Sequence, residues 1–267
     1  MGVVNVTPDS FSDGGMYLDA DAAIAHGKEL VRDGADILDV GGESTRPGAE
    51  PVSADEERAR IEPVVRALAA AGHAVSIDTS KLAVATAALD SGASIVNDVT
   101  ALRGDPDIGP LCAERGAGLV LMHMQGDPRT MQEAPAYDDV VDDVKAFLAE
   151  RLGVAVGAGV VEERVWLDPG IGFGKTLEHN LELLRRLGEL RELGRPLVVG
   201  TSRKSFIGKL DGSEVDERTG GTIASSVLAA AEGAAVLRVH DVAELADALK
   251  VADAILDAPT APAAETI

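Results

Sequence analysis

Short apolar runs rich in branched residues alternate along the chain with longer segments of helical character. Eight of these runs are predicted to be buried strands: 2–6, 37–40, 75–77, 94–96, 119–122, 165–167, 196–199 and 236–239. The clearest helical pattern follows Val140, where Val141, Val144, Phe147 and Leu148 recur at helical spacing. Eight strand–helix units in about 250 residues are typical of a (β/α)8 barrel, which is the predicted fold.

The segments between these runs are predicted to be helices, over 19–32, 53–72, 81–90, 107–115, 140–152, 178–192, 219–232 and 241–257. Ser53 with Glu56 three residues later predicts a capping box at the start of the second helix, and Pro63 can kink that helix. We expect one domain over 1–257 and a disordered tail over 258–267. An open doubly wound sheet is the alternative, but no Gly-x-Gly-x-x-Gly follows the first run.

Polar side chains of catalytic type stand where the predicted strands end. They are Asn5, Asp39, Asp78, Asn97, His123, Asp168, Ser202 with Lys204, and Arg238 with His240. One such residue means little, because solvent meets the ends of strands in any case. All strands of a barrel end on the same face, so eight together predict a pocket for a polar ligand.

The stretch 200–206 (GTSRKSF) follows one of these strands and carries two adjacent cations. Arg203 and Lys204, with three hydroxyl groups around them, suit an anion and a polar heterocycle. The alternative is a solvated basic turn, which is the commoner role of an Arg-Lys pair. The polar ends of the other strands favour the binding role.

One part of this polar set can recognise a planar heterocycle. Asp78 and Asp168 can accept parallel N–H bonds from an amino-pyrimidinone edge, Asn97 offers both a donor and an acceptor, and Lys204 can donate to a ring carbonyl. Taken alone, Asp168 is more often a turn cap before a proline. Phe173 lies in a Gly-rich loop where packing does not require an aromatic ring.

The other part can hold an anion. Arg238 and His240 supply donors, and the amide oxygen of Asn5 can ligate Mg²⁺, which prefers oxygen and often bridges phosphates. Taken alone, His240 is more often a helix cap or bonded to a carbonyl. Met122 and Ile95 are more often core residues than ligand contacts.

Composition narrows the class of protein. The 267 residues include 24 basic and 45 acidic side chains, for a net charge of −21, which disfavours nucleic acid and anionic membranes. Cys112 is the one cysteine, so no internal disulfide forms. No apolar run reaches the roughly 18 residues of a membrane span. The N-terminus has no basic region typical of a signal peptide, so we expect a cytoplasmic protein.

Eight segments, in order from Met1 to about Asp257, resemble the dihydropteroate synthases of folate biosynthesis. They are 1–15 (MGVVNVTPDSFSDGG), 41–48 (GGESTRPG), 76–79 (SIDT), 97–98 (ND), 122–126 (MHMQG), 168–175 (DPGIGFGK), 200–206 (GTSRKSF) and 238–242 (RVHDV). Several are weak alone, but eight in order are highly specific. Members usually have a further segment before the position of Met1 that helps cover the bottom of the barrel.

The resemblance implies a barrel that joins 6-hydroxymethyl-7,8-dihydropterin pyrophosphate to p-aminobenzoate by an SN1-like displacement, giving 7,8-dihydropteroate and pyrophosphate. It also implies Mg²⁺, sulfonamide inhibitors and a homodimer. The implied pterin contacts are Asp78, Asn97, Met122, Asp168, Phe173, Gly200 and Lys204. The implied p-aminobenzoate contacts are Phe11, Thr45, Arg46, Pro47 and Ser205. The implied pyrophosphate contacts are Asn5, Arg238 and His240, with Asn5 on the metal. The implied catalytic residues are Asp13, Arg46 and Lys204.

Two other functions share part of this pattern. A pterin-dependent methyltransferase would use the Asp-Asn-Asp set but has no need of the SRKS and RVH anion groups, which this chain has. A non-catalytic pterin-binding paralogue would be indicated by loss of Asp13 or Arg46, and both are present.

Overall fold

The computed structural model describes residues 1–6, 16–44, 51–126 and 130–257. Its eight strands pair in parallel, each with the next along the chain. The sheet closes because the N–H of Val3 donates to the carbonyl of Val239, and that of Val239 to the carbonyl of Met1, both at 3.0 Å. This closure confirms the barrel and excludes the open sheet. The strands are β1 Gly2–Asn5, β2 Ile37–Gly41, β3 Ala74–Asp78, β4 Ile95–Asp98, β5 Gly118–Met122, β6 Val165–Asp168, β7 Leu197–Val199 and β8 Ala234–Leu237.

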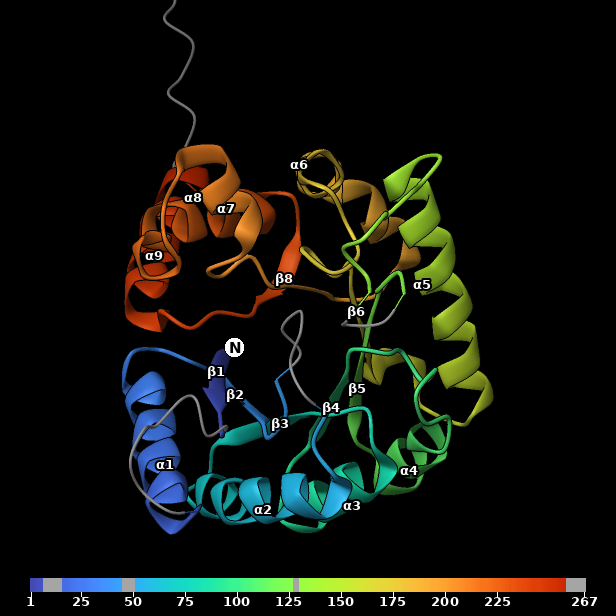
Figure 1. Ribbon diagram of the computed structural model, residues 1–267, viewed down its shortest axis with the longest axis vertical. Helices are drawn as coiled ribbons and strands as arrows, with labels where there is room; N and C mark the ends of the chain where they lie inside the picture. The colour runs from blue at the N-terminus through green and yellow to red at the C-terminus, as the bar shows by residue number, and fades with distance from the viewer. Residues whose placement is uncertain (7–15, 45–50, 127–129, 258–267) are drawn as a thin grey trace, which may run out of the picture.

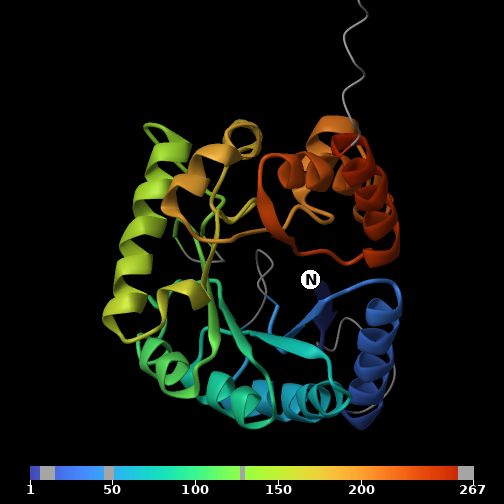
Figure 2. The ribbon, with the colours of Figure 1, turned by 180° about the vertical axis from the view of Figure 1, so that it is seen from behind.

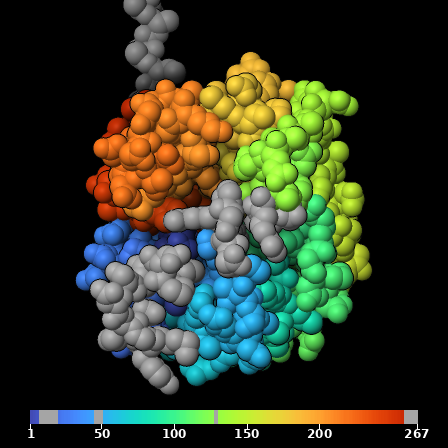
Figure 3. All heavy atoms as spheres, viewed as in Figure 1, coloured from blue at the N-terminus to red at the C-terminus, as the bar shows by residue number. Residues whose placement is uncertain are grey.

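Helices form a ring around the strands in both views (Figures 1 and 2). The first part of the chain, in blue, meets the last part, in orange to red, on the face seen in Figure 3. The α-helices are α1 Met16–Arg32, α2 Ala54–Ala70, α3 Leu82–Asp90, α4 Ile108–Arg115, α5 Val140–Gly157, α6 Leu177–Arg185, α7 Ser205–Asp211, α8 Thr219–Ala231 and α9 Val242–Leu256. The 3₁₀ helices are η2 Glu162–Arg164, η3 Leu187–Leu193 and η4 Val215–Glu217.

The helices differ from the prediction in four places. Helix α1 begins at Met16, before the predicted start, and α5 continues to Gly157, beyond the predicted end at 152. Helix α2 has the predicted N-cap Ser53, and Pro63 lies inside it. The helix predicted over 178–192 breaks after Arg185 into η3, where Gly188 lowers helix propensity and lies against Glu232. Helix α7 was not predicted, because it has seven residues, a central glycine and no apolar repeat.

The core has two parts separated by the strands. Alternate strand residues face outward and pack under the helices; Val40, Ile77, Leu121 and Leu167 are fully buried there. The other alternate residues face the barrel axis. At its lower end an apolar plug fills the barrel, made of Ile37, Ile95, Val120, Trp166, Val198 and Val236. Ile95 is therefore a core residue.

Two residues further along the same strands, the inward side chains become polar. Asp39 follows Ile37, Asn97 follows Ile95, Asp168 follows Trp166 and Arg238 follows Val236. The two-residue period of a strand thus places the polar groups directly above the plug, at the carboxyl ends of the strands.

Two further predictions concern membrane spans and the C-terminal tail. Among the described residues, no helix is long and apolar enough to cross a membrane. The predicted disordered tail, 258–267, lies outside the described residues.

Candidate active site

Arg238 joins two carboxylates that lie above the apolar plug. Its Nε donates to Asp39 Oδ2 at 2.6 Å, and its Nη2 donates to Asp78 Oδ2 at 2.8 Å. The amide of Asn97 donates to the same Asp39 oxygen at 3.1 Å. One fully buried carboxylate, Asp39, therefore holds side chains from β4 and from the residue after β8 in fixed positions.

The second oxygen of Asp78 has no partner among the described residues, although it is buried. Asp39 Oδ1 and Ser76 Oγ are also buried and have no hydrogen-bond partner among the described residues. A buried acceptor without a donor is costly, and where several occur together they indicate a polar group that the protein binds. Burial raises the pKa of Asp78 to about 7, although the Arg238 guanidinium opposes this shift.

Asp168 ends β6 and serves two roles at once. Its Oδ1 accepts the N–H of Gly170 at 2.7 Å, so the turn cap that we considered is present. Its Oδ2 accepts no hydrogen bond from the described residues and remains able to bind a ligand. Burial raises the pKa of Asp168, while the bond from Gly170 lowers it.

The loop after Asp168 folds tightly against the end of β5. Gly170 has a φ of +66°, and a Cβ there would lie 1.9 Å from the carbonyl oxygen of His123, so only glycine fits. Phe173 packs with Met122 in an apolar cluster at the mouth, and Lys204 Nζ lies 4.0 Å from the centre of the Phe173 ring. The predicted ring contacts and the predicted lysine are thus brought together.

The loops after β7 and β8 are tied to each other. Ser202 Oγ lies 2.9 Å from His240 Nδ1 and accepts the backbone N–H of His240 at 3.1 Å. Arg203 has a φ of +58°, and its Nε donates to Asp241 at 3.1 Å. The predicted cation pair is therefore split, because Arg203 pairs with Asp241 while Lys204 lies over Phe173.

Three other predicted residues occupy the same end of the barrel. Asn5 ends β1 and is half-buried; a Cβ on Gly41 would lie within 4.0 Å of both Asn5 Oδ1 and Asp78 Oδ2, so these two groups flank that glycine. Gly200 follows β7 and lies opposite the Arg238 carbonyl. Ser205 begins α7 and is exposed.

Five predicted residues, Phe11, Asp13, Thr45, Arg46 and Pro47, lie outside the described residues. Within the described ranges no group of three His, Cys, Asp or Glu side chains could hold a metal ion. The amide oxygen of Asn5 is a donor of the kind that Mg²⁺ accepts, and a bound anion could supply further oxygens. The residues present are therefore compatible with a Mg²⁺ ion that would be bound by Asn5 and by oxygens of the bound anion.

The sequence did not assign roles to three residues that organise this site. The sequence predicts Asp39 as a polar strand end, but it does not show that Asp39 is the shared partner of Asn97 and Arg238. His123 was expected at the mouth, but it is buried and burial lowers its pKa to about 2, so it is neutral. Lys175 is buried beside it, and burial lowers the lysine's pKa to about 7. The only signal in the sequence is that His123 and Lys175 lie in the segments 122–126 and 168–175 that resemble the family.

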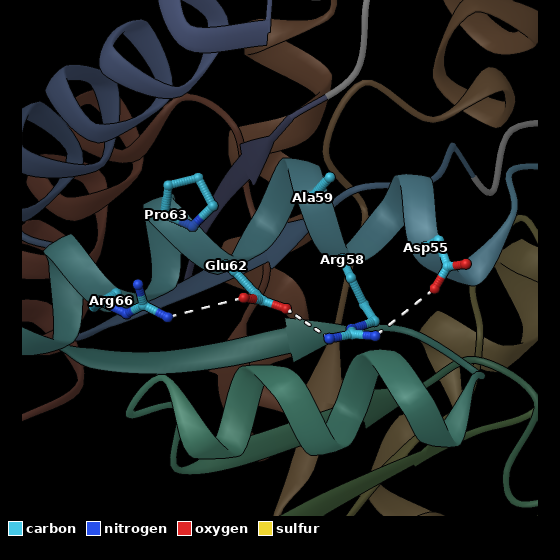
Figure 4. A pocket seen from close by; sticks show the side chains of 6 residues that line it. All are labelled: Asp55, Arg58, Ala59, Glu62, Pro63 and Arg66. Atoms are coloured by element: carbon cyan, nitrogen blue, oxygen red, sulfur yellow. Dashed lines mark hydrogen bonds and ion pairs between the residues drawn. The ribbon is translucent and has the colours of Figure 1, made fainter.

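A hollow on the outer face of α2 is unrelated to this site (Figure 4). It measures about 320 Å³ and is lined by charged residues that pair with one another. Arg58 lies 3.2 Å from Glu62 and 3.7 Å from Asp55, and Arg66 lies 3.8 Å from Glu62. These groups pair with one another on the outside of the helix, away from the strand ends.

The model of the pterin binding enzyme family matches residues 1–240 of this chain. The chain belongs to this family. It is 51% identical over 265 residues to the dihydropteroate synthase of Mycobacterium leprae, covering 97% of this chain and 93% of that one. It is 48% identical over 259 residues to the dihydropteroate synthase of Escherichia coli K12, covering 97% and 92%. Within the family it is thus a relative of the dihydropteroate synthases.

Solved structures of the family agree with this fold. The Xanthomonas albilineans dihydropteroate synthase with 4-aminobenzoic acid has a TM-score of 0.91 at 49% identity, covering 97% of this chain and 93% of that one. The same enzyme in complex with 7,8-dihydropteroate has a TM-score of 0.88 at 46% identity, covering 97% and 94%. The Yersinia pestis enzyme with a sulfonamide drug has a TM-score of 0.91 at 45% identity, covering 97% and 94%.

Proposed function

We propose that this pocket condenses 6-hydroxymethyl-7,8-dihydropterin pyrophosphate with p-aminobenzoate to give 7,8-dihydropteroate and pyrophosphate, a step of folate biosynthesis. The observation that carries the proposal is the buried set of acceptors at the mouth, where neither Asp78 Oδ1 nor Asp168 Oδ2 accepts a hydrogen bond from the residues that the structure describes. The family and the Xanthomonas albilineans complex with 7,8-dihydropteroate support it.

The pterin is recognised along its polar edge. Its amino-pyrimidinone N–H groups donate to Asp168, and further ring donors reach Asp78 and Asn97. Lys204 donates to the ring carbonyl from above Phe173, and Met122 and Phe173 flank the ring. Because Asp78 already accepts a hydrogen bond from Arg238 and Asn97 already donates one to Asp39, the ligand meets side chains with fixed orientations.

The pyrophosphate lies on the side of β1 and β8. His240 and the remaining guanidinium donors of Arg238 bind its oxygens, and Asn5 contributes an amide oxygen to Mg²⁺. When bound, Mg²⁺ supplies positive charge to the leaving group. Ser202 keeps the His240 ring in place through Nδ1, so the other ring nitrogen faces the anion.

The displacement is SN1-like. The C–O bond to pyrophosphate breaks first, and its electron pair leaves with the oxygen. The pterin cation that remains is stabilised by the Asp78 and Asp168 carboxylates and by Asp13. The aniline nitrogen of p-aminobenzoate then attacks the methylene carbon and loses a proton. Carboxylates beside the ring and cations beside the leaving group thus favour the same charge separation.

The second substrate is bound by Ser205 together with Phe11, Thr45, Arg46 and Pro47. Arg46 and Lys204 complete the catalytic set with Asp13. Sulfonamides, which mimic the aniline and the acid of p-aminobenzoate, compete for the same place. The Yersinia pestis structure with a sulfonamide drug supports this part of the proposal.

We further propose that the protein is a cytoplasmic homodimer. Helices α8 and α9 expose large apolar side chains: Leu228 is 65% exposed, Val251 61% and Ile255 68%. Apolar groups of this size on adjacent helices are typical of a surface that another chain covers. Sedimentation of the wild type and of Leu228→Asp tests the dimer, and a monomeric wild type would contradict it.

An assay of pyrophosphate release tests the proposed reaction. We expect release that requires both the pterin pyrophosphate and p-aminobenzoate, with 7,8-dihydropteroate formed in equal amount. EDTA should stop it and Mg²⁺ should restore it. Tight pterin binding without turnover would instead indicate a non-catalytic paralogue, and turnover in excess EDTA would remove Mg²⁺ from the proposal.

A further inference from the structure

Lys175 is a fully buried lysine for which the proposed reaction has no use. Only 2% of its surface is exposed, and it is the largest of the fully buried side chains among the described residues. Lysine is rarely buried to this extent unless its ammonium group is fully paired, because removing the charge from water is costly. Its position therefore requires an explanation.

All three donors of the Lys175 ammonium group are in use. Nζ lies 2.9 Å from His123 Nδ1, 3.0 Å from the carbonyl oxygen of Gly170 and 2.9 Å from that of Phe173. His123 is neutral, so its Nδ1 accepts and its proton sits on Nε2. The ammonium group thus ties two carbonyls of the loop 169–174 to the side chain that follows β5.

The loop bends around this ammonium group. Gly170, Gly172 and Gly174 have φ angles of +66°, +84° and +62°, which turn the backbone in a way that other residues rarely adopt. The carbonyls on either side of Gly172, those of Gly170 and Phe173, reach the same nitrogen. The lysine therefore occupies the centre of the loop, as a bound cation would.

This loop carries two groups that the proposed function places on the pterin. The N–H of Gly170 fixes Asp168 Oδ1, and the Phe173 carbonyl bound to Lys175 belongs to the residue whose ring lies under Lys204. A displacement of the loop would move the carboxylate and the ring together. The p-aminobenzoate contacts come from other loops.

We propose that Lys175 is a positioning residue, whose protonated side chain holds the loop 169–174 in the shape that presents Asp168 and Phe173 to the pterin. This inference rests on the proposed pterin chemistry. Lys175 does not touch the substrate; it acts through the two residues that do. Its loss should therefore weaken pterin binding selectively, rather than raise the KM values for both substrates equally.

Lys175→Met tests this directly, since it keeps the length of the side chain and removes every donor. We expect the KM for the pterin pyrophosphate to rise at least tenfold, with the KM for p-aminobenzoate within twofold of wild type. Lys145→Met on the outer helix α5 is the matched control and should leave both values unchanged. An unchanged pterin KM in Lys175→Met would overturn the inference.

Rescue by a small amine separates positioning from general stability. In Lys175→Ala, propylammonium should enter the vacated space and lower the pterin KM in a saturable manner, whereas propanol should not. Failure of the amine to lower the raised KM would contradict the role of the cation. If the wild type itself forms no dihydropteroate, the proposed function fails and not this inference, which is then judged by calorimetry of the pterin alone.

If neither Lys175 variant folds, the variant His123→Leu tests the inference instead. It removes one acceptor of the ammonium group and leaves both loop carbonyls bound, so the protein should fold. We expect the pterin KM to rise about threefold with the KM for p-aminobenzoate unchanged. Equal changes in both KM values, or no change in either, would overturn the proposal.

Discussion

The two sides of the barrel mouth are built differently. On one side stands a polar wall (Asp39, Asp78, Asn97 and Asp168), whose residues are at most 8% exposed and lie on the strands β2, β3, β4 and β6. On the other stands a loop rim (Ser202, Lys204 and His240), which follows β7 and β8 and in which Lys204 and His240 are half-exposed. The wall is fixed by strand register and the rim by bonds between loops.

The wall is suited to recognise a rigid shape, and the rim to adapt to its ligand. The wall is oriented before a ligand arrives, because Arg238 and Asn97 are bound to Asp39. It suits a rigid planar heterocycle whose donors have fixed spacing. The rim lies on loops, and its Lys204 and His240 are half-exposed, which suits a flexible, hydrated anion.

The largest effect should come from the base of the wall. Asp39→Asn removes a fully buried charge and leaves the Arg238 guanidinium with one carboxylate instead of two. Breaking a buried ion pair on one side costs about 3–5 kcal/mol of unfolding free energy. Urea unfolding measures this, with the exposed Asp247→Asn as control. A loss near zero would mean that Asp39 does not support the wall.

Asp168→Asn should act on binding rather than on folding. The new amide can keep the bond from Gly170 through its oxygen but turns a donor toward the pterin's own donor. The loss of a charge-assisted pair and this clash should cost about 2–4 kcal/mol of pterin affinity. Calorimetry with the pterin measures it, and an unchanged affinity would remove Asp168 from the pterin site.

The pKa of Asp78, raised to about 7 by burial, predicts a pH dependence with opposite signs for binding and for stability. The carboxylate must be ionised to accept from the pterin, so affinity should fall about fivefold between pH 7 and pH 6. The folded protein binds more protons here than the unfolded chain between the two pKa values, so this group's contribution to stability rises as the pH falls from 7 toward 4.

Asp78→Asn is the control for both parts of this prediction. It cannot titrate, so both dependences should flatten in the variant. Asp168, whose pKa is also raised, would then account for what remains. A wild-type pterin affinity that is constant from pH 7 to pH 6 would contradict the raised pKa of Asp78.

The smallest effect should come from the rim. Ser202→Ala removes the hydroxyl that contacts both the ring and the backbone N–H of His240. A hydrogen bond of this kind contributes about 1 kcal/mol, so pyrophosphate affinity should fall severalfold. Pterin affinity should stay within twofold. Competition binding with pyrophosphate measures the first and calorimetry the second, and a larger loss of pterin affinity would contradict the division of the mouth.

The sequence predicts the residues of the polar wall better than the hydrogen bonds and ion pairs that hold them. A two-residue period places Asp78, Asn97 and Asp168 at inward strand ends, and parallel strands bring those ends together whatever the loops do. The pairing of Arg238 with Asp39 spans 199 positions and depends on closure of the barrel. No local pattern carries that information.

Other features cannot be predicted from the sequence for a different reason. Lys175 ends a glycine-rich motif and reads there as an ordinary surface cation, because burial depends on how the loop folds back on it. The division of the Arg203-Lys204 pair depends on the left-handed backbone of Arg203, which a non-glycine residue seldom adopts. Helix α7 is too short to show a period.

The most direct test of the contrast between the two sides is a cross-comparison by calorimetry. The wild type, Asp168→Asn and His240→Ala are each titrated with 6-hydroxymethylpterin and, separately, with pyrophosphate and Mg²⁺. We predict that Asp168→Asn weakens pterin binding at least tenfold and leaves pyrophosphate binding within twofold, and that His240→Ala does the reverse. If each variant weakened both ligands equally, the wall and the rim would not be separate binding surfaces.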